Sequence, residues 1–312
     1  LNDINDASIT VIDHFIGQRG VVDQVKVALE ASWNDSIRFP HALMIGPPGV
    51  GKSELAHVLG KEMGSEAFEQ LAQNISSIEQ MRGLLLEPKD KDILFIDEIH
   101  ELNPSVQTTL YRAMENGEVF LDGGKAKNRV MKIASFTIIG ATTDEYKLLK
   151  PLRDRFKLVL PFKFYGDEEL ALLLKHRSKQ LGWSVEDEGI FNQIATRSKG
   201  TPRIALKILE AAKRYARSLG EKCITLEHFN SSCSLEGLDS LGLGSVERDY
   251  LKILAEQKEP VRLNVLASRM GLPKKTLTDT IEGFLMRVGL IIKSDKGLMI
   301  SPDGLEHLSN NI

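Results

Sequence analysis

Short apolar runs alternate with amphipathic stretches through the first half of the chain. Three runs are continuous and of strand length, at residues 42–45, 93–96 and 136–140. Helical spacing of apolar residues follows the first run as far as Met63, and it returns from Pro104 to Met114. Continuous apolar strands between helices are typical of a parallel sheet with helices on both faces. Residues 118–121 and 130–133, on either side of Asp122-Gly123-Gly124, predict a β-hairpin.

Beyond Pro161 the strand signals stop and helical signals replace them. Four helices are predicted, separated by glycines, at residues 167–181, 187–197, 202–219 and 225–234. A Gly/Leu/Ser stretch at residues 237–244 has the composition of a linker. The pattern then predicts three helices and a two-stranded hairpin, at residues 245–257, 262–270, 274–288, 290–293 and 298–300. Three helices followed by a hairpin are typical of a winged helix.

These patterns divide the chain into an α/β part (1–165), a small helical part (166–242) and a winged-helix part (243–312). The length of 312 residues agrees with two or three domains. Hydrophobic residues make up 42% and charged residues 27%, which argues against a disordered or fibrous chain. The apolar runs are all far shorter than the ~20 residues of a membrane span, so no membrane association is expected.

Cysteine content indicates the cellular compartment of the protein, but the net charge does not identify its binding partner. The net charge of −3 does not indicate nucleic-acid binding, so any DNA contact must rest on local clusters of basic residues. The two cysteines, Cys223 and Cys233, favour a reduced compartment over a disulfide scaffold. No signal-peptide pattern opens the chain, and we expect a cytoplasmic protein.

Gly46-Pro47-Pro48-Gly49-Val50-Gly51-Lys52-Ser53 fits the pattern G-x-x-x-x-G-K-[ST] of a phosphate-binding loop. It lies between a predicted strand and a predicted helix, as such a loop requires. The backbone N–H groups from Gly49 to Glu54 are expected to wrap the phosphates of a nucleotide, and Lys52 to reach the β- and γ-phosphates. The Ser53 hydroxyl is a candidate Mg²⁺ ligand. The alternative is a tight turn that matches the pattern by chance.

Asp97 and Glu98 follow the second apolar run directly. A carboxylate at the end of a strand is suited to organise Mg²⁺ beside the phosphate loop, and Glu98 is suited to polarise an attacking water. A solvated acidic turn is the alternative. His100 either responds to the state of the nucleotide or simply begins the next helix.

Four further motifs occur in a fixed order, at residues 97–100 (DEIH), 140–143 (GATT), 151–156 (PLRDRF) and 200–205 (GTPRIA). In this order, with a winged helix behind them, they resemble the RuvB family of AAA+ motors, which drive branch migration of Holliday junctions in bacteria. The resemblance runs from Phe15-Ile16-Gly17-Gln18 to the C-terminal wing. It implies an AAA+ P-loop ATPase domain, a helical lid and a winged-helix domain, with ATP and Mg²⁺ as cofactors.

The resemblance also implies roles for single residues. Thr142 or Thr143 would be the sensor that contacts the γ-phosphate or the water. Arg155, with Arg153 as a close competitor, would be the arginine finger that enters the nucleotide site of a neighbouring subunit, which implies a homo-hexamer. The alternative for both arginines is an exposed ion pair with Asp154, which contributes little.

Arg203 matches the family's second sensor, an arginine that opens a lid helix and reaches the bound phosphates. Its alternative is an ion pair with a nearby acid. Tyr165 matches a nucleotide-contacting tyrosine between the two AAA+ parts, and a half-buried hinge aromatic is equally compatible. Glu115-Asn116-Gly117 falls where the family approaches the adjacent subunit's nucleotide.

Lys274, Lys293 and Lys296 are the candidate DNA-binding residues of the winged helix, because a helix N-terminus and a wing are where this fold contacts phosphates. Lys274 and Lys293 also match basic positions of the family. An arginine that the family has just after the wing turn is Leu298 here. The alternative is a solvated face on a packing domain.

Three segments depart from the family pattern. A Ser-Gly-Pro…Pro-Gly-Asp segment expected between the two nucleotide motifs is replaced by residues 71–82. An Arg-Pro pair expected before Phe15 is absent, and the stretch reads Ala7-Ser8-Ile9-Thr10. The hairpin is shorter than usual and carries Lys125, Lys127, Arg129 and Lys132, whereas the family docks this hairpin on the junction-binding partner RuvA through apolar contacts.

The function that these residues predict is an ATP-dependent DNA motor, a DNA-dependent ATPase and helicase that acts on four-way junctions in recombination and repair. Two alternatives share the ATPase core. One is an ATPase of the clamp-loader or replication-maintenance type, which has a different C-terminal collar. The other is a DNA-binding regulator in which ATP switches assembly and no strand moves.

Overall fold

The computed structural model describes residues 9–121 and 129–310, which form two compact units. The first unit comprises the chain up to Glu169 together with Thr201–Arg203, and the second comprises Leu170–Gly200 and the residues from Ile204 onward. The hairpin turn predicted at Asp122-Gly123-Gly124, the basic residues Lys125 and Lys127, and the departures at Ala7 and Ser8 lie outside the described residues.

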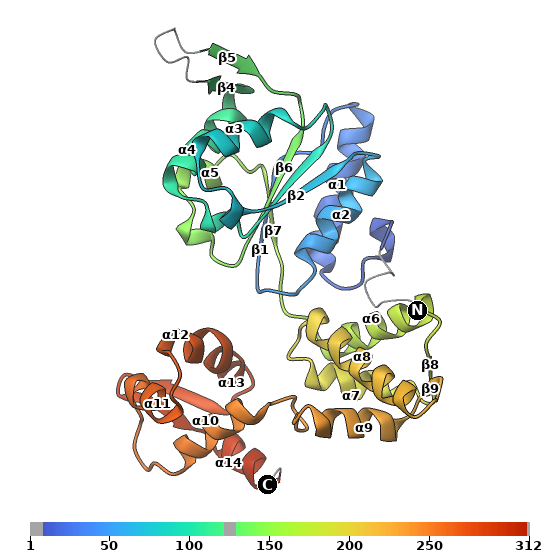
Figure 1. Cartoon of the computed structure of the whole chain (residues 1–312), viewed down its shortest axis with the longest axis vertical. Coiled ribbons are helices and arrows are strands. Elements are labelled where there is room, and N and C mark those ends of the chain that lie inside the picture. The colour runs from blue at the N-terminus through green and yellow to red at the C-terminus, as the bar shows by residue number, and fades with distance from the viewer. Residues whose placement is uncertain (1–8, 122–128, 311–312) are drawn as a thin grey trace. The chain divides into compact units, whose positions relative to one another are not determined.

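A five-stranded parallel sheet forms the centre of the first unit (Figure 1). Its strands, in spatial order, are β2 (Ala67–Leu71), β3 (Ile93–Asp97), β6 (Thr137–Thr142), β1 (Ala42–Ile45) and β7 (Leu158–Pro161). The three apolar runs of the sequence are the three central strands β3, β6 and β1, all of which are buried except at the end of β3 and β1. The predicted parallel sheet is therefore confirmed.

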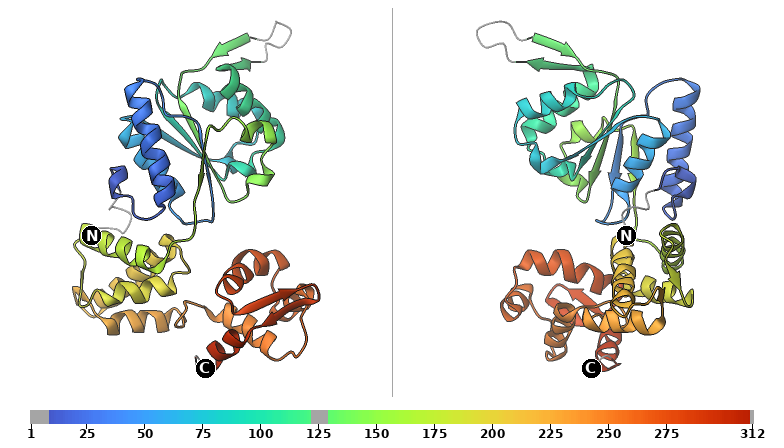
Figure 2. Two further views of the ribbon diagram at one scale, coloured as in Figure 1. Left: turned by 180° about the vertical axis from the view of Figure 1, so that it is seen from behind. Right: turned by 45° about the vertical axis from the view of Figure 1, so that its right-hand side comes forward.

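Helices cover both faces of this sheet (Figures 1 and 2). One face carries α1 (Arg19–Asn34) and α2 (Lys52–Glu62), and the other carries α3 (Ile78–Leu86), α4 (Pro104–Asn116) and α5 (Lys150–Arg153). Local chemistry fixes where two of them begin. The Ser77 hydroxyl accepts the Gln80 amide in a capping box at α3, and the Asn103 side chain caps α4.

Short 3-10 turns complete the first unit at Ile12–His14, Ala72–Asn74, Ile99–Glu101 and Glu145–Lys147. The predicted hairpin is confirmed as the antiparallel pair β4 (Glu118–Leu121) and β5 (Arg129–Lys132), in which Val119 pairs with Met131. It begins directly after the left-handed Gly117 that ends α4.

The second unit opens with a helical group, as the sequence predicts. Its helices are α6 (Asp167–Gln180), α7 (Gly189–Arg197), α8 (Pro202–Ser218) and α9 (Leu226–Leu235), and the first residues of α6 and α8 belong to the first unit. The expectation that strands stop after Pro161 is wrong here, because β8 (Ser184–Val185) and β9 (Cys223–Ile224) pair in parallel. Two residues are too few to give a period-two pattern, so these strands leave no signal in the sequence.

A winged helix follows in the same unit, as predicted. Its elements are α10 (Ser245–Ala255), α11 (Leu263–Met270), α12 (Lys274–Thr276), a π-helical turn at Leu277–Glu282, α13 (Gly283–Arg287), β10 (Ile291–Ser294), β11 (Gly297–Ile300) and α14 (Pro302–Asn310). The third predicted helix is the continuous helical segment 274–287. Val261 pairs with Leu298 and extends the wing sheet. The last helix, α14, was not predicted from the sequence.

Among residues 9–121 and 129–310, every helix is too short or too polar to cross a bilayer.

Candidate functional site

The carboxyl ends of the three central strands bring the candidate catalytic residues together. Parallel pairing sets Ile45 of β1 opposite Thr142 of β6, and Ile96 of β3 opposite Gly140 of β6. The phosphate loop leaves β1 at Gly46, and Asp97 ends β3. The loop, the acidic motif and the threonine pair therefore share one edge of the sheet, which is where ligands bind in open α/β sheets.

Lys52 is the first residue of α2 and is buried. Its ammonium donates hydrogen bonds to the carbonyls of Gly46 (2.7 Å) and Pro47 (2.9 Å). Burial lowers the pKa of Lys52, while the negative charges of Glu98 and Asp97 act in the opposite direction. Because both carboxylates influence this ammonium, the lysine and the acidic motif belong to one electrostatic site.

Glu98 has a left-handed backbone, with φ 48° and ψ 44°. A non-glycine residue in this region costs on the order of 1–3 kcal/mol, and such strain concentrates at functional sites. The Asp97 carboxylate accepts the Glu98 amide at 2.9 Å, and the Glu98 carboxylate accepts the Thr143 hydroxyl at 3.2 Å. These bonds hold Glu98 at the sheet edge.

His100 is almost enclosed between three polar side chains. Its Nδ1 lies 3.0 Å from the Thr142 hydroxyl and 3.2 Å from the Glu98 carboxylate, and its Nε2 lies 3.1 Å from Glu101. It also stands in the 3-10 turn after β3, so both interpretations from the sequence have a structural counterpart.

The two candidate sensor threonines differ sharply in environment. Thr142 has 0% exposure, and its hydroxyl contacts His100 and accepts the Asp144 amide at 3.0 Å. Thr143 is exposed and points its hydroxyl at Glu98. Thr143 is therefore the one whose oxygen is accessible at the sheet edge.

Tyr165 is buried beside the phosphate loop, and burial raises the pKa of its phenol. A Cβ built on Gly17 would lie 2.3 Å from its ring, and one built on Gly51 would lie 3.8 Å from its hydroxyl. The Phe-Ile-Gly-Gln segment, the loop and this tyrosine therefore pack together.

Thr201 and Arg203 lie against the phosphate loop although they are far from it in the sequence. The Arg203 amide donates to the Gly49 carbonyl at 3.3 Å. Gly49 has φ +74°, and a Cβ there would lie 2.9 Å from the Thr201 methyl and 3.0 Å from the Arg203 Cβ. Only glycine fits this contact without a shift. The positive charge of Arg203 also contributes to the lowered pKa of Lys52.

Arg155 has an ion partner other than Asp154. Its Nη2 lies 2.5 Å from the carboxylate of Glu115 on α4, and this hydrogen bond raises the pKa of the guanidinium. Its Nε is buried without a hydrogen-bond partner among the described residues. Arg153 instead lies over the ring of Tyr146, 5.9 Å from the centroid.

The candidate DNA-binding lysines are all exposed in the winged helix. Lys274 begins α12, Lys293 lies on β10, and Lys296 lies in the turn that joins the wing strands. Arg287, at the end of α13, donates to a backbone carbonyl of the helical group instead.

Sequence reasoning missed Glu101, and it named Glu115 only as a residue near the adjacent subunit's nucleotide, not as a partner of Arg155. Glu101 holds the far nitrogen of His100, and Glu115 is the ion partner of Arg155. Glu101 lies one residue beyond the DEIH motif and had no pattern of its own. Glu115 lies 40 positions before Arg155, so only the packing of α4 against the end of α5 brings them together.

Three profiles of one protein family match consecutive parts of the chain. They describe the Holliday junction DNA helicase RuvB P-loop domain (residues 9–162), the RuvB AAA lid domain (165–239) and the RuvB C-terminal winged helix domain (240–309).

Individual proteins are similar over nearly the same span. The Holliday junction branch migration complex subunit RuvB of Kosmotoga olearia is 33% identical over 302 residues, covering 95% of this chain and 88% of that protein. The subunit of the same name from Anaeromyxobacter strain K is 34% identical over 304 residues, covering 96% and 89%. The structure of the Thermotoga maritima RuvB Holliday junction branch migration motor superposes with a TM-score of 0.83 at 30% identity, covering 97% of this chain and 98% of that one.

Proposed function

The chain belongs to the RuvB family, and on this premise we propose that it is an ATP-driven motor that moves Holliday junctions by branch migration. The observation that carries the proposal is the combination, in one chain, of a nucleotide site at the sheet edge with a lid and a winged helix of this family. The clamp-loader alternative expects a different C-terminal collar, and the winged helix argues against it.

The domain boundaries belong to the proposal as well. Residues 1–165 form the ATPase domain, 166–242 the lid and 243–312 the DNA-binding domain. The family profiles, which change near residues 162 and 239, support this division. The unpaired Cys223 and Cys233 agree with a reduced, cytoplasmic setting.

ATP is held by the loop from Gly49 to Glu54, where backbone N–H groups at the start of α2 point at the phosphates. Lys52 exchanges the carbonyls of Gly46 and Pro47 for phosphate oxygens. The Ser53 hydroxyl and the Asp97 carboxylate are hard oxygen donors of the kind that Mg²⁺ prefers, and they fit this ion. When bound by these two residues, Mg²⁺ would supply positive charge against the charge that develops on the transferred phosphoryl group.

Water activation falls to Glu98, whose carboxylate is fixed by its left-handed backbone and by Thr143. We assign the sensor role to Thr143 rather than to Thr142, because only Thr143 has an exposed hydroxyl beside Glu98. Thr142 and His100 support this carboxylate from the buried side.

The arginine finger is assigned to Arg155. A guanidinium that is already fixed by Glu115 costs less side-chain entropy to position, and the Arg155 side chain is still 35% exposed. Because a finger acts on a neighbour's nucleotide, the site is complete only in an assembly, and a ring of six copies is proposed from the family.

DNA is bound through Lys274, Lys293 and Lys296, which are exposed on the recognition segment and the wing. With few phosphate contacts, binding should weaken steeply as salt rises. A RuvA-type partner is proposed to dock on the hairpin β4–β5, whose apolar side chains Phe120, Val130 and Met131 are 39%, 49% and 42% exposed. The exposed Arg129 and Lys132 beside them make this surface more basic than the apolar one expected from the family.

The test is branch migration of a synthetic four-way junction at low salt, with ATP and Mg²⁺, with and without a RuvA-type protein. Lys52→Ala serves as the inactive control and Lys61→Ala, an exposed lysine of the same helix, as the matched active one. We expect migration by the wild type and by Lys61→Ala, and none by Lys52→Ala. ATP hydrolysis by the wild type without any movement of the junction would refute the motor function.

A further inference from the structure

Lys199 lies at the point where the chain passes from the second unit to the nucleotide site of the first. Thr201 and Arg203, two and four residues later, contact Gly49 of the phosphate loop. Consecutive Cα atoms are about 3.8 Å apart, so Lys199 is joined to that contact by a covalent path of only two residues. A change in the phosphate loop therefore reaches Lys199 through very little chain.

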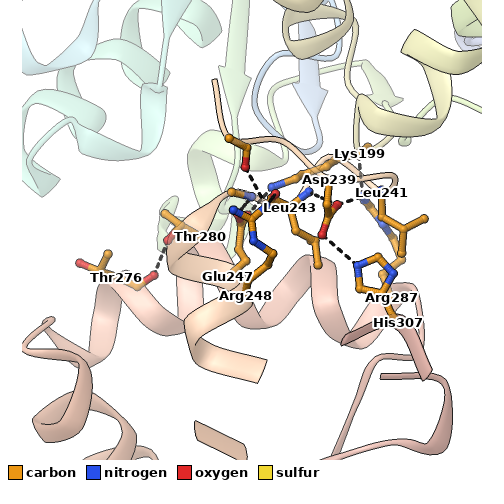
Figure 3. A network of polar contacts seen from close by, with 12 residues as sticks. Lys199, Asp239, Leu241, Leu243, Glu247, Arg248, Thr276, Thr280, Arg287 and His307 are labelled. Carbon is orange, nitrogen blue, oxygen red and sulfur yellow. Dashed lines mark hydrogen bonds and ion pairs between the residues drawn. The ribbon is translucent and has the colours of Figure 1, made fainter. Parts of the chain in front are cut away.

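Lys199 is itself held by the winged helix (Figure 3). Its ammonium pairs with the Glu247 carboxylate of α10 and lies 5.2 Å from the ring centroid of Phe284 on α13. Its carbonyl accepts a hydrogen bond from Arg287 at 2.5 Å. The side chains of Lys199 and Glu247 are only 19% and 14% exposed, so this pair is screened far less by solvent than a surface ion pair.

The backbone at Lys199 is also constrained, with φ +53°. A positive φ is uncommon for lysine and persists only where the surroundings impose it. The contacts with Glu247, Phe284 and Arg287 are such surroundings, because they fix both the side chain and the carbonyl of this residue.

A second set of contacts makes the segment between the helical group and the winged helix rigid. The buried Asp239 carboxylate accepts the amides of Leu241 and Leu243, each at 2.9 Å, and pairs with His307 of α14 at 2.9 Å (Figure 3). Gly242 (φ +74°) lies so close to Arg197 that a Cβ would be 2.0 Å from its carbonyl oxygen. The segment of linker composition therefore contacts both the helical group, at Arg197, and the winged helix, at His307.

The helical segment that Lys199 contacts is the one that carries a proposed DNA contact. Phe284 and Arg287 lie at its end, and Lys274 lies at its beginning. The segment of 14 residues spans roughly 20 Å at 1.5 Å per residue. A displacement at its end is thus carried to Lys274 by a single element.

From these contacts we propose that Lys199 is a positioning residue that couples the nucleotide site to the DNA-binding domain. The inference rests on the proposed function and specifies how it is regulated. It predicts that nucleotide and junction DNA change each other's affinity by the same factor, as linkage requires, and that this factor depends on the Lys199–Glu247 pair.

The experiment measures the Kd of the full chain for a fluorescent four-way junction with Mg-ADP and with a slowly hydrolysed Mg-ATP analogue. The ratio of the two Kd values is the coupling factor, and couplings of this kind are typically about 5- to 150-fold. Lys199→Met keeps the length of the side chain and removes its charge. We expect a coupling factor close to unity in this variant, with DNA-independent ATP turnover unchanged.

Three further variants separate coupling from folding. Lys199→Arg should retain most of the coupling, because it keeps the charge. Lys207→Met, at an exposed lysine of α8, should behave as the wild type. Glu247→Gln should lose coupling as Lys199→Met does, and it gives an independent result if Lys199→Met melts at a lower temperature.

A wild-type coupling factor in both Lys199→Met and Glu247→Gln would overturn the inference. So would an equal loss of junction affinity with both nucleotides, since that indicates a direct DNA contact. Branch migration assays of the same proteins distinguish failure of the coupling from failure of the proposed motor function. A wild type that fails to migrate refutes the motor and the coupling together, whereas migration by Lys199→Met at the wild-type rate refutes the coupling alone.

Discussion

At the scale of single residues, the site depends on how four side chains share one edge of the sheet. Glu98 stands in a strained backbone and is held from the solvent side by Thr143 and from the buried side by His100. Thr142 supports His100 from within the core. Adjacent threonines thus have different tasks, because Thr142 is the last residue of the buried strand β6 and Thr143 follows it in an exposed bend.

The two threonines should therefore fail in different ways when they are changed. Thr143→Val removes an exposed hydroxyl and should lower ATP turnover by about 10²-fold or more, in the range seen for loss of one transition-state donor, with no change in the melting temperature. Thr142→Val leaves the partly buried Asp144 amide without its acceptor and removes one of the three polar contacts of His100, and it should lower the free energy of unfolding by about 1–3 kcal/mol. ATP turnover and thermal melts of both variants test this. Loss of turnover in Thr142→Val, with normal turnover in Thr143→Val, would move the sensor role to Thr142.

The sequence was sufficient to predict most of the residues that form the candidate site, but not how their side chains are arranged. Lys52, Ser53, Asp97 and Glu98 belong to motifs whose residue types and spacing follow from phosphate and Mg²⁺ chemistry. The choice between Thr142 and Thr143 needed the direction of each side chain. The partnership of Arg155 with Glu115 needed the packing of two helices, which no local pattern contains.

At the scale of elements, continuous apolar runs predicted the central strands, since these are buried on both faces. The edge strand β2 includes Glu69 and Gln70 and shows no such run, so it was not recognised. The start of β1 has a further feature. His41 precedes it, is buried, and accepts the Ile138 amide of β6 through Nδ1 at 2.8 Å.

This histidine should make the first unit sensitive to acid. Burial, together with the charges of Arg38 and Lys157, lowers the pKa of His41 from 6.5 to about 3. Below pH 6.5 the unfolded chain binds a proton that the folded unit excludes, so stability falls by about 1.4 kcal/mol per pH unit down to the folded pKa. We expect a loss of about 2 kcal/mol between pH 7.5 and pH 5 from this group alone.

Urea unfolding at both pH values, followed by the fluorescence of Trp33 in a Trp183→Phe background, would measure the loss. His41→Gln keeps an acceptor for the Ile138 amide and does not titrate. It should be less stable at pH 7.5, but its loss of stability between pH 7.5 and pH 5 should be smaller than that of the wild type by about 2 kcal/mol. An unchanged slope in His41→Gln would assign the acid sensitivity to other groups.

At the scale of the whole molecule, the proposed active site is divided between copies of the chain. Lys52 belongs to the copy that binds ATP, and Arg155 is contributed by its neighbour. In a ring built from head-to-tail contacts, each interface then joins one loop and one finger. A monomer holds both residues but cannot bring its own finger to its own loop.

Mixing two inactive variants tests this division. Lys52→Ala and Arg155→Ala should each lack turnover, and Arg155→Ala should still bind ATP, because the exposed pair with Glu115 contributes little to stability. In an equal mixture about one interface in four joins an intact loop to an intact finger, so about a quarter of wild-type turnover should return. Turnover in the mixture no higher than in the separate variants would indicate that the finger is a different residue.

The chain passes from the second unit back to the first at Thr201–Arg203, and this has a consequence for recombination between related genes. Thr201–Arg203 fold with the first unit although the residues on both sides fold with the second. A genetic crossover placed anywhere between residues 166 and 200 would join a phosphate loop from one ancestor to a Thr201–Arg203 segment from another, across the tight contact at Gly49. Hybrids with such a junction should be rare among living sequences. We therefore expect a lid to be inherited together with its ATPase domain, because the Thr201–Arg203 segment must fit the phosphate loop that it contacts.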